Sequence, residues 1–230
     1  MSEITFKECV TKLLYPYTKP TISASRTPST TSALEKGNNQ TITKVAVTVT
    51  KKSEPITSVA LYNGSTLIEE KTSGVENGGT INFTVSVPVN STNVVLTAKA
   101  TDAAGSTVSA NTANWNFVYP YYYGVCTVDE YPNITGADLR DSTKFTKDIA
   151  AKGNKSYTYT TNNQCMVIAF PKAHGALKSA IDPSGFQNIG DFTINVREIN
   201  VTGLDGTAQT YYMYRNGAST NSGFKFAFTH

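Results

Sequence analysis

The residue types that most often perform chemistry are scarce in this sequence. The chain contains two histidines, His174 and His230, and three cysteines, Cys9, Cys126 and Cys165. Two histidines nearly exclude histidine-based metal sites and Ser-His-Asp catalysis. The cysteines are odd in number and far apart in the sequence, and no Cys-x-x-Cys pair is present to hold zinc. We therefore predict no catalytic residue, no metal site and no cofactor.

Carboxylates offer the remaining catalytic option, an acid pair of the glycosidase type. The candidates are Asp129, Glu130, Asp138, Asp141, Asp182, Asp191 and Asp205. Nothing in their spacing selects one pair, and most are explained as turn and cap residues. His174 lies in the turn-like stretch PKAHGAL and is interpreted as a solvated loop residue. Because GxSxG, GxGxxG and Walker-type motifs are also missing, we predict that the protein is not an enzyme.

The composition predicts a globular, β-rich protein. Charged residues make up 16% of the chain, below the usual value of about 25%. The formal net charge of +3 is small and evenly scattered, which argues against nucleic-acid binding. No stretch approaches the roughly 18 apolar residues of a membrane-spanning helix, so no membrane insertion is expected. Residues 1–15 do not look like a secretory signal, and the cysteine usage fits synthesis in a reducing cytoplasm.

The sequence of the first half of the chain predicts an arm followed by a β-sandwich. Residues 1–20 contain Pro16 and Pro20 and are interpreted as an extended N-terminal docking arm. Residues 21–118 show about seven short alternating segments with turn signals between them, a pattern typical of an immunoglobulin-like (Ig-like) sandwich. The Asn63-Gly64 pair between two such segments is a strong hairpin signal.

The sequence of the second half of the chain predicts another mostly β domain. Residues 119–125 are rich in tyrosine and are interpreted as a packed junction between the two domains. Residues 126–230 predict a C-terminal β-rich domain with one helix over 136–151. The apolar run at 166–170 predicts a buried strand. The expected fold class is therefore mainly β, with an N-terminal Ig-like sandwich followed by a second, mostly β domain that contains one short helix.

Exposed tyrosines are the candidate ligand-binding residues. The aromatic candidates are Tyr121, Tyr122, Tyr123, Tyr211, Tyr212 and Tyr214. A tyrosine ring has an apolar body and a polar tip, which suits either a sugar-binding surface or a domain seam. Since alternation along a strand buries half of such rings, a core position is the alternative for each of them.

Long stretches of the chain resemble a family of tailed-bacteriophage virion proteins, of the tail, tail-fibre or other appendage type. The resemblance rests on LYPYTKPTISAS, KKSEPITSVALYNGSTLIEEKTSGVENGGT, FVYPYYYGV and KGNKSYTYTTNNQCMVIAFPKAHGALKSAIDPSGF. It covers most of the chain, with an Ig-like module, a YPYYYG junction and a C-terminal β domain in the same order. These are scaffold motifs, so no site residue is carried over from the family.

The resemblance implies a structural component of a bacteriophage virion, in the tail, neck or head appendage. Such a protein is made in the host bacterial cytoplasm and contributes to assembly and host-surface attachment. The implied partners are other virion proteins, contacted through the N-terminal arm, further copies of the chain, and a host cell-surface glycan. Low charge with abundant Tyr and Phe also suits assembly interfaces. Two alternatives stay open: a small polysaccharide-degrading tail spike enzyme, and a bacterial surface Ig-like adhesin.

Overall fold

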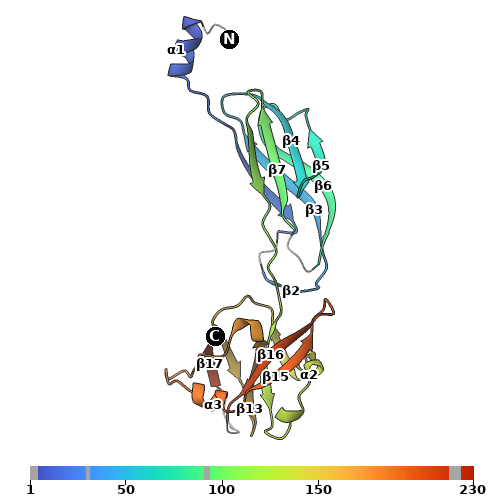
Figure 1. Ribbon diagram of the computed structural model, residues 1–230, viewed down its shortest axis with the longest axis vertical. Helices are drawn as coiled ribbons and strands as arrows, with labels where there is room; N and C mark the ends of the chain where they lie inside the picture. Colours follow the sequence, from blue (N-terminus) through green and yellow to red (C-terminus); the bar gives the residue numbers. More distant parts are fainter. Residues whose placement is uncertain (1–4, 30–31, 91–93, 218–223) are drawn as a thin grey trace. The chain divides into compact units, whose positions relative to one another are not determined.

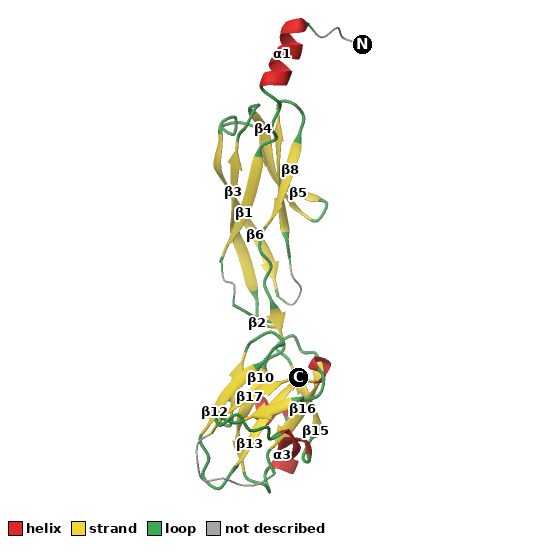
Figure 2. Ribbon diagram, turned by 90° about the vertical axis from the view of Figure 1, so that its left-hand side faces the viewer, coloured by secondary structure: helices red, strands yellow, loops and turns green. Residues whose placement is uncertain are grey.

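The chain folds into two compact units. The computed structural model describes residues 5–29, 32–90, 94–217 and 224–230. The first unit comprises Met1–Thr30, Gln40–Val89 and Asn93–Asn114, and the second comprises Thr31–Asn39, Asn90–Thr92 and Trp115–His230. Strands dominate both units, and the helices are short (Figures 1 and 2). The predicted mainly β fold class is confirmed.

The first unit is a β-sandwich of two antiparallel sheets. Its elements are α1 (Phe6–Leu14), β1 (Thr21–Thr27), β3 (Gln40–Thr50), β4 (Ile56–Asn63), β5 (Thr66–Lys71), β6 (Gly78–Val89), β7 (Leu96–Asp102) and β8 (Thr107–Asn111). One sheet has the strand order β1-β3-β6, and the other has the order β5-β4-β7-β8. Strands β3, β6 and β7 alternate over most of their length between more buried and more exposed side chains, as expected for sheets with one face on a common core.

Two local features of the sandwich follow directly from the sequence. In β3, Val45, Val47 and Val49 are buried at every second position. Ile42 joins the same buried face because a register irregularity between Ile42 and Lys44 shifts the alternation by one residue. Gly64 has φ of 59° in the turn between β4 and β5, which confirms the predicted hairpin. Asn63 pairs with Thr66 at the end of the strands, so the two turn residues are Gly64 and Ser65.

The N-terminal arm differs from the prediction because part of it is helical. Residues 6–14 form α1, and Pro16 and Pro20 lie beyond its C-terminal end, where they do not interrupt the helix. Phe6, Val10 and Leu13 recur at helical spacing and form an apolar stripe. The sequence prediction gave more weight to the two prolines that follow than to this 3.6-residue period. The first four residues of the predicted arm lie outside the described part of the chain.

The second unit is built around a five-stranded antiparallel sheet. Its elements are β2 (Leu34–Glu35), β9 (Phe117–Val118), β10 (Tyr121–Cys126), η1 (Tyr131–Asn133), α2 (Gly136–Arg140), β11 (Phe145–Asp148), β12 (Lys155–Tyr159), β13 (Cys165–Pro171), η2 (Lys172–His174), β14 (Ser179–Ile181), α3 (Ile189–Thr193), β15 (Arg197–Thr202), β16 (Ala208–Arg215) and β17 (Phe224–Thr229). The main sheet has the order β11-β10-β13-β16-β15, and a smaller sheet has the order β12-β17-β14.

Both faces of the five-stranded sheet are covered by apolar side chains. All seven residues of β13 are buried. Ile168 and Phe170 face one core cluster, while Val167 and Ala169 face the other. This arrangement confirms the buried strand that the apolar run at 166–170 predicts.

The expected junction is instead a strand inside the second unit. Tyr121–Cys126 forms β10, which pairs with β11 on one side and β13 on the other. Trp115–His230 also belongs to this unit, so its boundary precedes the predicted residue 126. A strand that is covered on both faces lacks the polar residue at every second position that marks a half-exposed strand. For this reason the tyrosine-rich sequence was interpreted as a junction between domains.

The predicted helix over 136–151 is wrong in its length. α2 covers only Gly136–Arg140, where Thr135 and Asp138 form a capping box at its N-terminus. Asp141, the C-cap residue, is extended, and residues Phe145–Asp148 then form β11. Phe145 is buried opposite Gly124 of β10, so pairing with the sheet prevails over continued helix.

A short segment from the first half of the chain also belongs to the second unit. We call residues 32–39 the inserted segment. Leu34 and Glu35 pair in parallel with Phe117 and Val118. Glu35 is buried, and its carboxylate accepts hydrogen bonds from Arg140 at 2.6 Å and Lys147 at 2.7 Å. The prediction of a sandwich running without interruption over 21–118 therefore needs correction.

Candidate functional site

Four of the six candidate tyrosines cannot bind a ligand from solvent. Tyr121 and Tyr214 lie in one core cluster of the second unit, and Tyr122 and Tyr211 lie in the other. Each is no more than 2% exposed. Successive residues of β10 and β16 point to opposite faces of a sheet that is covered on both faces, so neither orientation leaves these rings free. Their assignment as sugar-stacking residues is corrected.

The remaining two candidates, Tyr123 and Tyr212, are half-buried. The ring of Tyr123 stacks on that of Tyr157, with centroids 4.0 Å apart. The Nζ atom of Lys172 lies 5.5 Å from the ring centroid of Tyr212. Each ring therefore already has a partner within the second unit, which leaves little aromatic surface for a sugar.

His174 is not a solvated loop residue, contrary to the sequence interpretation. Its ring stacks on His230 with centroids 5.3 Å apart and an interplanar angle of 16°. The hydroxyl of Tyr121 and Nε2 of His230 share a hydrogen bond of 2.7 Å. The Nδ1 atom of His174 is buried and has no hydrogen-bond partner among the described residues. The Pro/Gly context of His174 correctly marks a turn, but the turn folds back over the sheet.

The stacked histidines predict a pH dependence of stability. Burial, followed by the positive charges of His230, Lys152 and Lys155, lowers the pKa of His174 to about 4. A histidine with a lowered folded-state pKa stabilises the fold fully above its unfolded-state pKa of about 6.5, and this contribution is lost as the pH falls toward 4. The second unit is therefore expected to lose stability between pH 6.5 and 4.

Urea unfolding at pH 7.5, 6 and 5 tests this expectation. Trp115 is the one tryptophan of the chain and is buried in the second unit, so its fluorescence reports on that unit. His174→Gln should flatten the loss of unfolding free energy between pH 6.5 and 5, because glutamine does not titrate. An unchanged slope in the variant would contradict the assignment. His230 has a pKa lowered by burial and stays in both proteins, so some slope is expected to remain.

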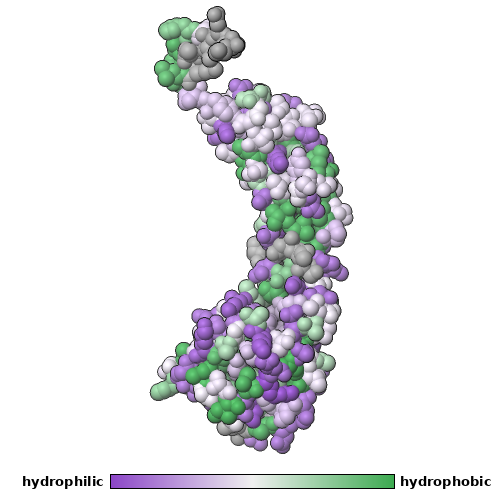
Figure 3. Space-filling view, in the orientation of Figure 1, coloured by the Kyte–Doolittle hydropathy of each residue, from purple (hydrophilic) through white to green (hydrophobic). Residues whose placement is uncertain are grey.

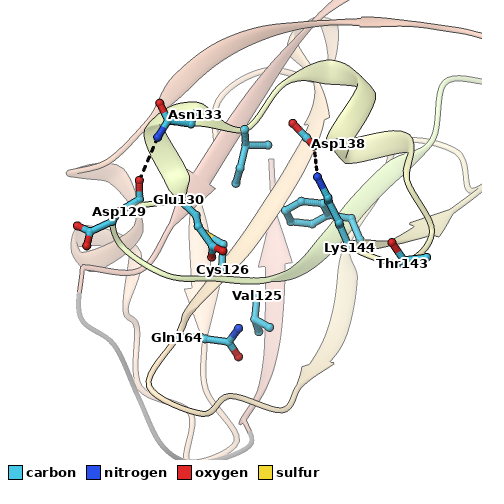
Figure 4. A pocket seen from close by; sticks show the side chains of 11 residues that line it. Val125, Cys126, Asp129, Glu130, Asn133, Asp138, Thr143, Lys144 and Gln164 are labelled. Atoms are coloured by element: carbon cyan, nitrogen blue, oxygen red, sulfur yellow. Dashed lines mark hydrogen bonds and ion pairs between the residues drawn. The ribbon is translucent and has the colours of Figure 1, made fainter.

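A pocket of about 590 Å³ in the second unit is the candidate functional site (Figure 4). Strand β10 contributes Val125 and Cys126, and the loop after it contributes Asp129 and Glu130. The other lining residues are Asn133, Ile134, Asp138, Thr143, Lys144, Phe145 and Gln164. The pocket thus combines three carboxylates, two amides and one cation with an apolar wall.

Two carboxylates of the pocket are fixed by neighbouring threonines. Glu130 accepts hydrogen bonds from the backbone N–H and the hydroxyl of Thr127, at 2.8 and 2.9 Å. Asp138 accepts equivalent bonds from Thr135, at 2.8 and 2.6 Å. Lys144 forms an ion pair with Asp138. The side chains of Glu130 and Asp138 are therefore held in place before any ligand arrives.

These hydrogen bonds also decide what the pocket can do chemically. The bonds from Thr127 lower the pKa of Glu130, and the bonds from Lys144 and Thr135 lower the pKa of Asp138. A glycosidase needs one carboxyl group with a raised pKa to donate a proton. Neither Glu130 nor Asp138 has the raised pKa that this proton donor requires. They suit non-covalent recognition of a polar ligand, such as the hydroxyl groups of a sugar.

The sequence contained a signal for this pocket that spacing between carboxylates alone does not reveal. Thr127 precedes Glu130 by three residues, and Thr135 precedes Asp138 by three residues. This Thr-x-x-acid spacing is the capping-box pattern, and it occurs here twice within twelve residues. The sequence identifies Asp129, Glu130 and Asp138 as carboxylates, but their convergence depends on tertiary packing, in which η1, α2 and β10 contribute side chains to one core cluster. No local sequence pattern marks Lys144 or Gln164 as a pocket residue.

Comparisons with known proteins identify no family for this chain. No protein-family model matches the chain, and no curated protein matches its sequence. Among solved structures, the fibronectin(III)-like modules of CbhA from Clostridium thermocellum match at 14% identity. That match covers 63% of this chain and 84% of the other, with a TM-score of 0.23. It concerns a fibronectin-III/Ig-like β module, and the bacteriophage resemblance stays a prediction. Within the described ranges, no helix is long and apolar enough to cross a bilayer.

Proposed function

We propose that the protein is a structural component of a bacteriophage virion, joined to another virion protein through α1. The observation that carries the proposal is the exposed apolar surface of this helix. Phe6 is 85% exposed, Leu13 is 82% exposed and Leu14 is 65% exposed. Figure 3 shows the apolar residues of α1 as a green surface. Single exposed apolar residues are common on proteins, but a cluster on one short helix marks an interaction site.

Helix stability supports the same conclusion. α1 has nine residues, and isolated helices shorter than about 12–15 residues are marginal in water. An amphipathic helix of this kind gains stability when its apolar face enters a hydrophobic groove on a partner. We assign that groove to another virion protein, in agreement with the family resemblance of the sequence.

Attachment to the host surface is assigned to the pocket of the second unit. Its fixed carboxylates, amides and lysine provide hydrogen-bond acceptors and donors, and Phe145 provides an apolar wall. Such a mixture is suited to a cell-surface glycan, whose rings present both hydroxyl groups and apolar C–H faces. In this proposal the protein resides in the virion and forms a homo-oligomer with further copies of itself.

Replacing Leu13 and Leu14 together by glutamate is expected to remove the protein from purified particles. The charges would have to be buried in the groove, which is unfavourable when they are unpaired. The measurement is an immunoblot and immunogold electron microscopy of particles that assemble with each variant. Leu67→Glu is the matched control, since Leu67 is an exposed leucine, 48% exposed, in the sandwich. The control should be incorporated like the natural protein.

Three outcomes would count against the proposal. Absence of the natural chain from particles contradicts a virion role. Incorporation of the double variant at the natural level contradicts docking through α1. If light scattering shows that the purified chain self-associates and that the double variant is monomeric, then a second copy covers α1 and the assigned groove is wrong.

A further inference from the structure

Two cysteines that are distant in the sequence are direct neighbours across the main sheet of the second unit. Cys126 is the last residue of β10, and Cys165 is the first residue of β13. The two strands are antiparallel, and these residues are partners in the register. Both side chains are buried thiols. The spacing of the cysteines in the sequence does not indicate this pairing, which arises from the strand register.

The register places the two residues within the Cα separation that a disulfide spans. Directly opposite residues in an antiparallel pair have Cα atoms about 4.5 or 5.5 Å apart, and disulfides span Cα distances of about 4.4–6.8 Å. The two side chains of such a pair also point to the same face of the sheet. Cys126 and Cys165 form the terminal pair of this ladder, so small adjustments in the backbone do not propagate through the sheet.

We propose that Cys126 and Cys165 form an oxidisable dithiol, which a small disulfide reagent such as oxidised glutathione converts to a cross-strand disulfide. In the first step, the thiolate of one cysteine attacks a sulfur of the reagent, which forms a mixed disulfide and releases one glutathione thiolate. In the second step, the other cysteine attacks the protein sulfur of the mixed disulfide and releases the second glutathione. Two thiol protons leave the protein, and its two electrons reduce the reagent to two thiols.

The pocket determines which cysteine reacts first. Cys126 lines the 590 Å³ pocket, and the pocket gives a small reagent a path to its sulfur. Cys165 does not line the pocket and is 0% exposed. Its Sγ atom lies 3.8 Å from Nη1 of Arg215 and does not border the pocket. Cys126 is therefore the attacking cysteine, and Cys165 is the resolving cysteine.

The environment of Cys126 predicts slow oxidation at neutral pH. Burial, followed by the charge of the neighbouring Cys165, raises the pKa of Cys126 to about 12. Only the thiolate attacks, so the rate should rise about tenfold for each pH unit below this pKa. The dithiol would stay reduced in a glutathione-rich cytoplasm and oxidise gradually in an oxidising medium.

The test uses the full chain with Cys9 replaced by serine, incubated with oxidised glutathione at pH 7, 8 and 9. Mass spectrometry should show a loss of about 2 Da as the internal disulfide forms. The oxidised protein should unfold at a temperature higher by on the order of 5–10 °C, followed by Trp115 fluorescence. In Cys165→Ser, the resolving thiol is absent, and a glutathione adduct of about 305 Da should accumulate on Cys126. Cys126→Ser is the matched control and should stay unmodified.

Each departure from these results has a defined meaning. If the folded chain shows no mass loss while the urea-unfolded chain oxidises, the dithiol is not accessible to a disulfide reagent and the proposal is wrong. If Cys126→Ser gains the adduct and Cys165→Ser does not, the proposed order of attack is overturned. A rate independent of pH would contradict attack by a thiolate with a raised pKa. None of these measurements depends on the virion role or on α1.

Discussion

Replacing Glu35 by glutamine is expected to lower the free energy of unfolding of the second unit by about 2–3 kcal/mol. The Glu35 side chain is 1% exposed, while its partners Arg140 and Lys147 are 24% and 41% exposed. Breaking a buried ion pair costs about 3–5 kcal/mol when the remaining charge stays buried. Here both cations retain access to water, which reduces the expected cost. Urea unfolding followed by Trp115 fluorescence measures the difference.

The exposed ion pair between Lys172 and Glu198 provides the control. Its Nζ–Oε1 distance is 2.6 Å, equal to the Arg140–Glu35 distance, but its side chains are 44% and 51% exposed. Exposed pairs contribute about 0.2–1 kcal/mol, so Glu198→Gln should change stability by less than about 1 kcal/mol. Equal losses in the two variants would show that burial of Glu35 is not the source of the effect.

Replacing Gly37 by alanine is expected to destabilise the second unit by about 2–4 kcal/mol. Gly37 has φ of +90°, a conformation that residues with a Cβ rarely adopt. A Cβ at this position would lie 2.2 Å from the backbone nitrogen of Asp205. Backbone atoms cannot move aside as a flexible side chain can, so the inserted segment would have to shift away from the turn after β15. The same fluorescence-detected urea unfolding measures the loss.

Gly175→Ala separates the two causes of this loss. Gly175 has φ of +92° in the second unit, almost the same value, and nothing lies within 4 Å of the point that a Cβ would occupy there. The control variant therefore carries the conformational strain alone, for which about 1 kcal/mol is expected. If Gly37→Ala costs no more than Gly175→Ala, the close approach to Asp205 does not constrain the inserted segment.

Strand alternation made the sandwich predictable, and its absence made the second unit harder to predict. In β3, valines at every second position identify a strand with one buried face. In β10, consecutive tyrosines occupy two different cores, so the sequence shows neither alternation nor a continuous aliphatic run. The tyrosines were therefore assigned to a seam or a ligand surface, although burial on both faces explains them. The helical spacing of apolar residues in 6–14 indicates α1, but Pro16 and Pro20 beyond it led to the prediction of an extended arm.

The pocket and the dithiol depend on tertiary pairing, which local patterns do not encode. Glu130 and Asp138 each carry a recognisable capping signal, but they reach one pocket only because η1, α2 and β10 share a core cluster. The pairing of Cys126 with Cys165 depends on the register of two strands that are joined by a long connection. A shift of that register by one residue would place the two cysteines on opposite faces.

The inserted segment has a consequence for the order in which the chain folds during synthesis. Glu35 precedes Arg140 by 105 residues and Lys147 by 112 residues. It therefore leaves the ribosome well before its partners have been made, and domains generally begin to fold from the N-terminal side. The sandwich strands through β8 are complete before β10 is translated. The first unit can therefore fold while the inserted segment is still a loop without its partners. We therefore expect capture of that loop to be a late step in the folding of the second unit, since it closes a long loop.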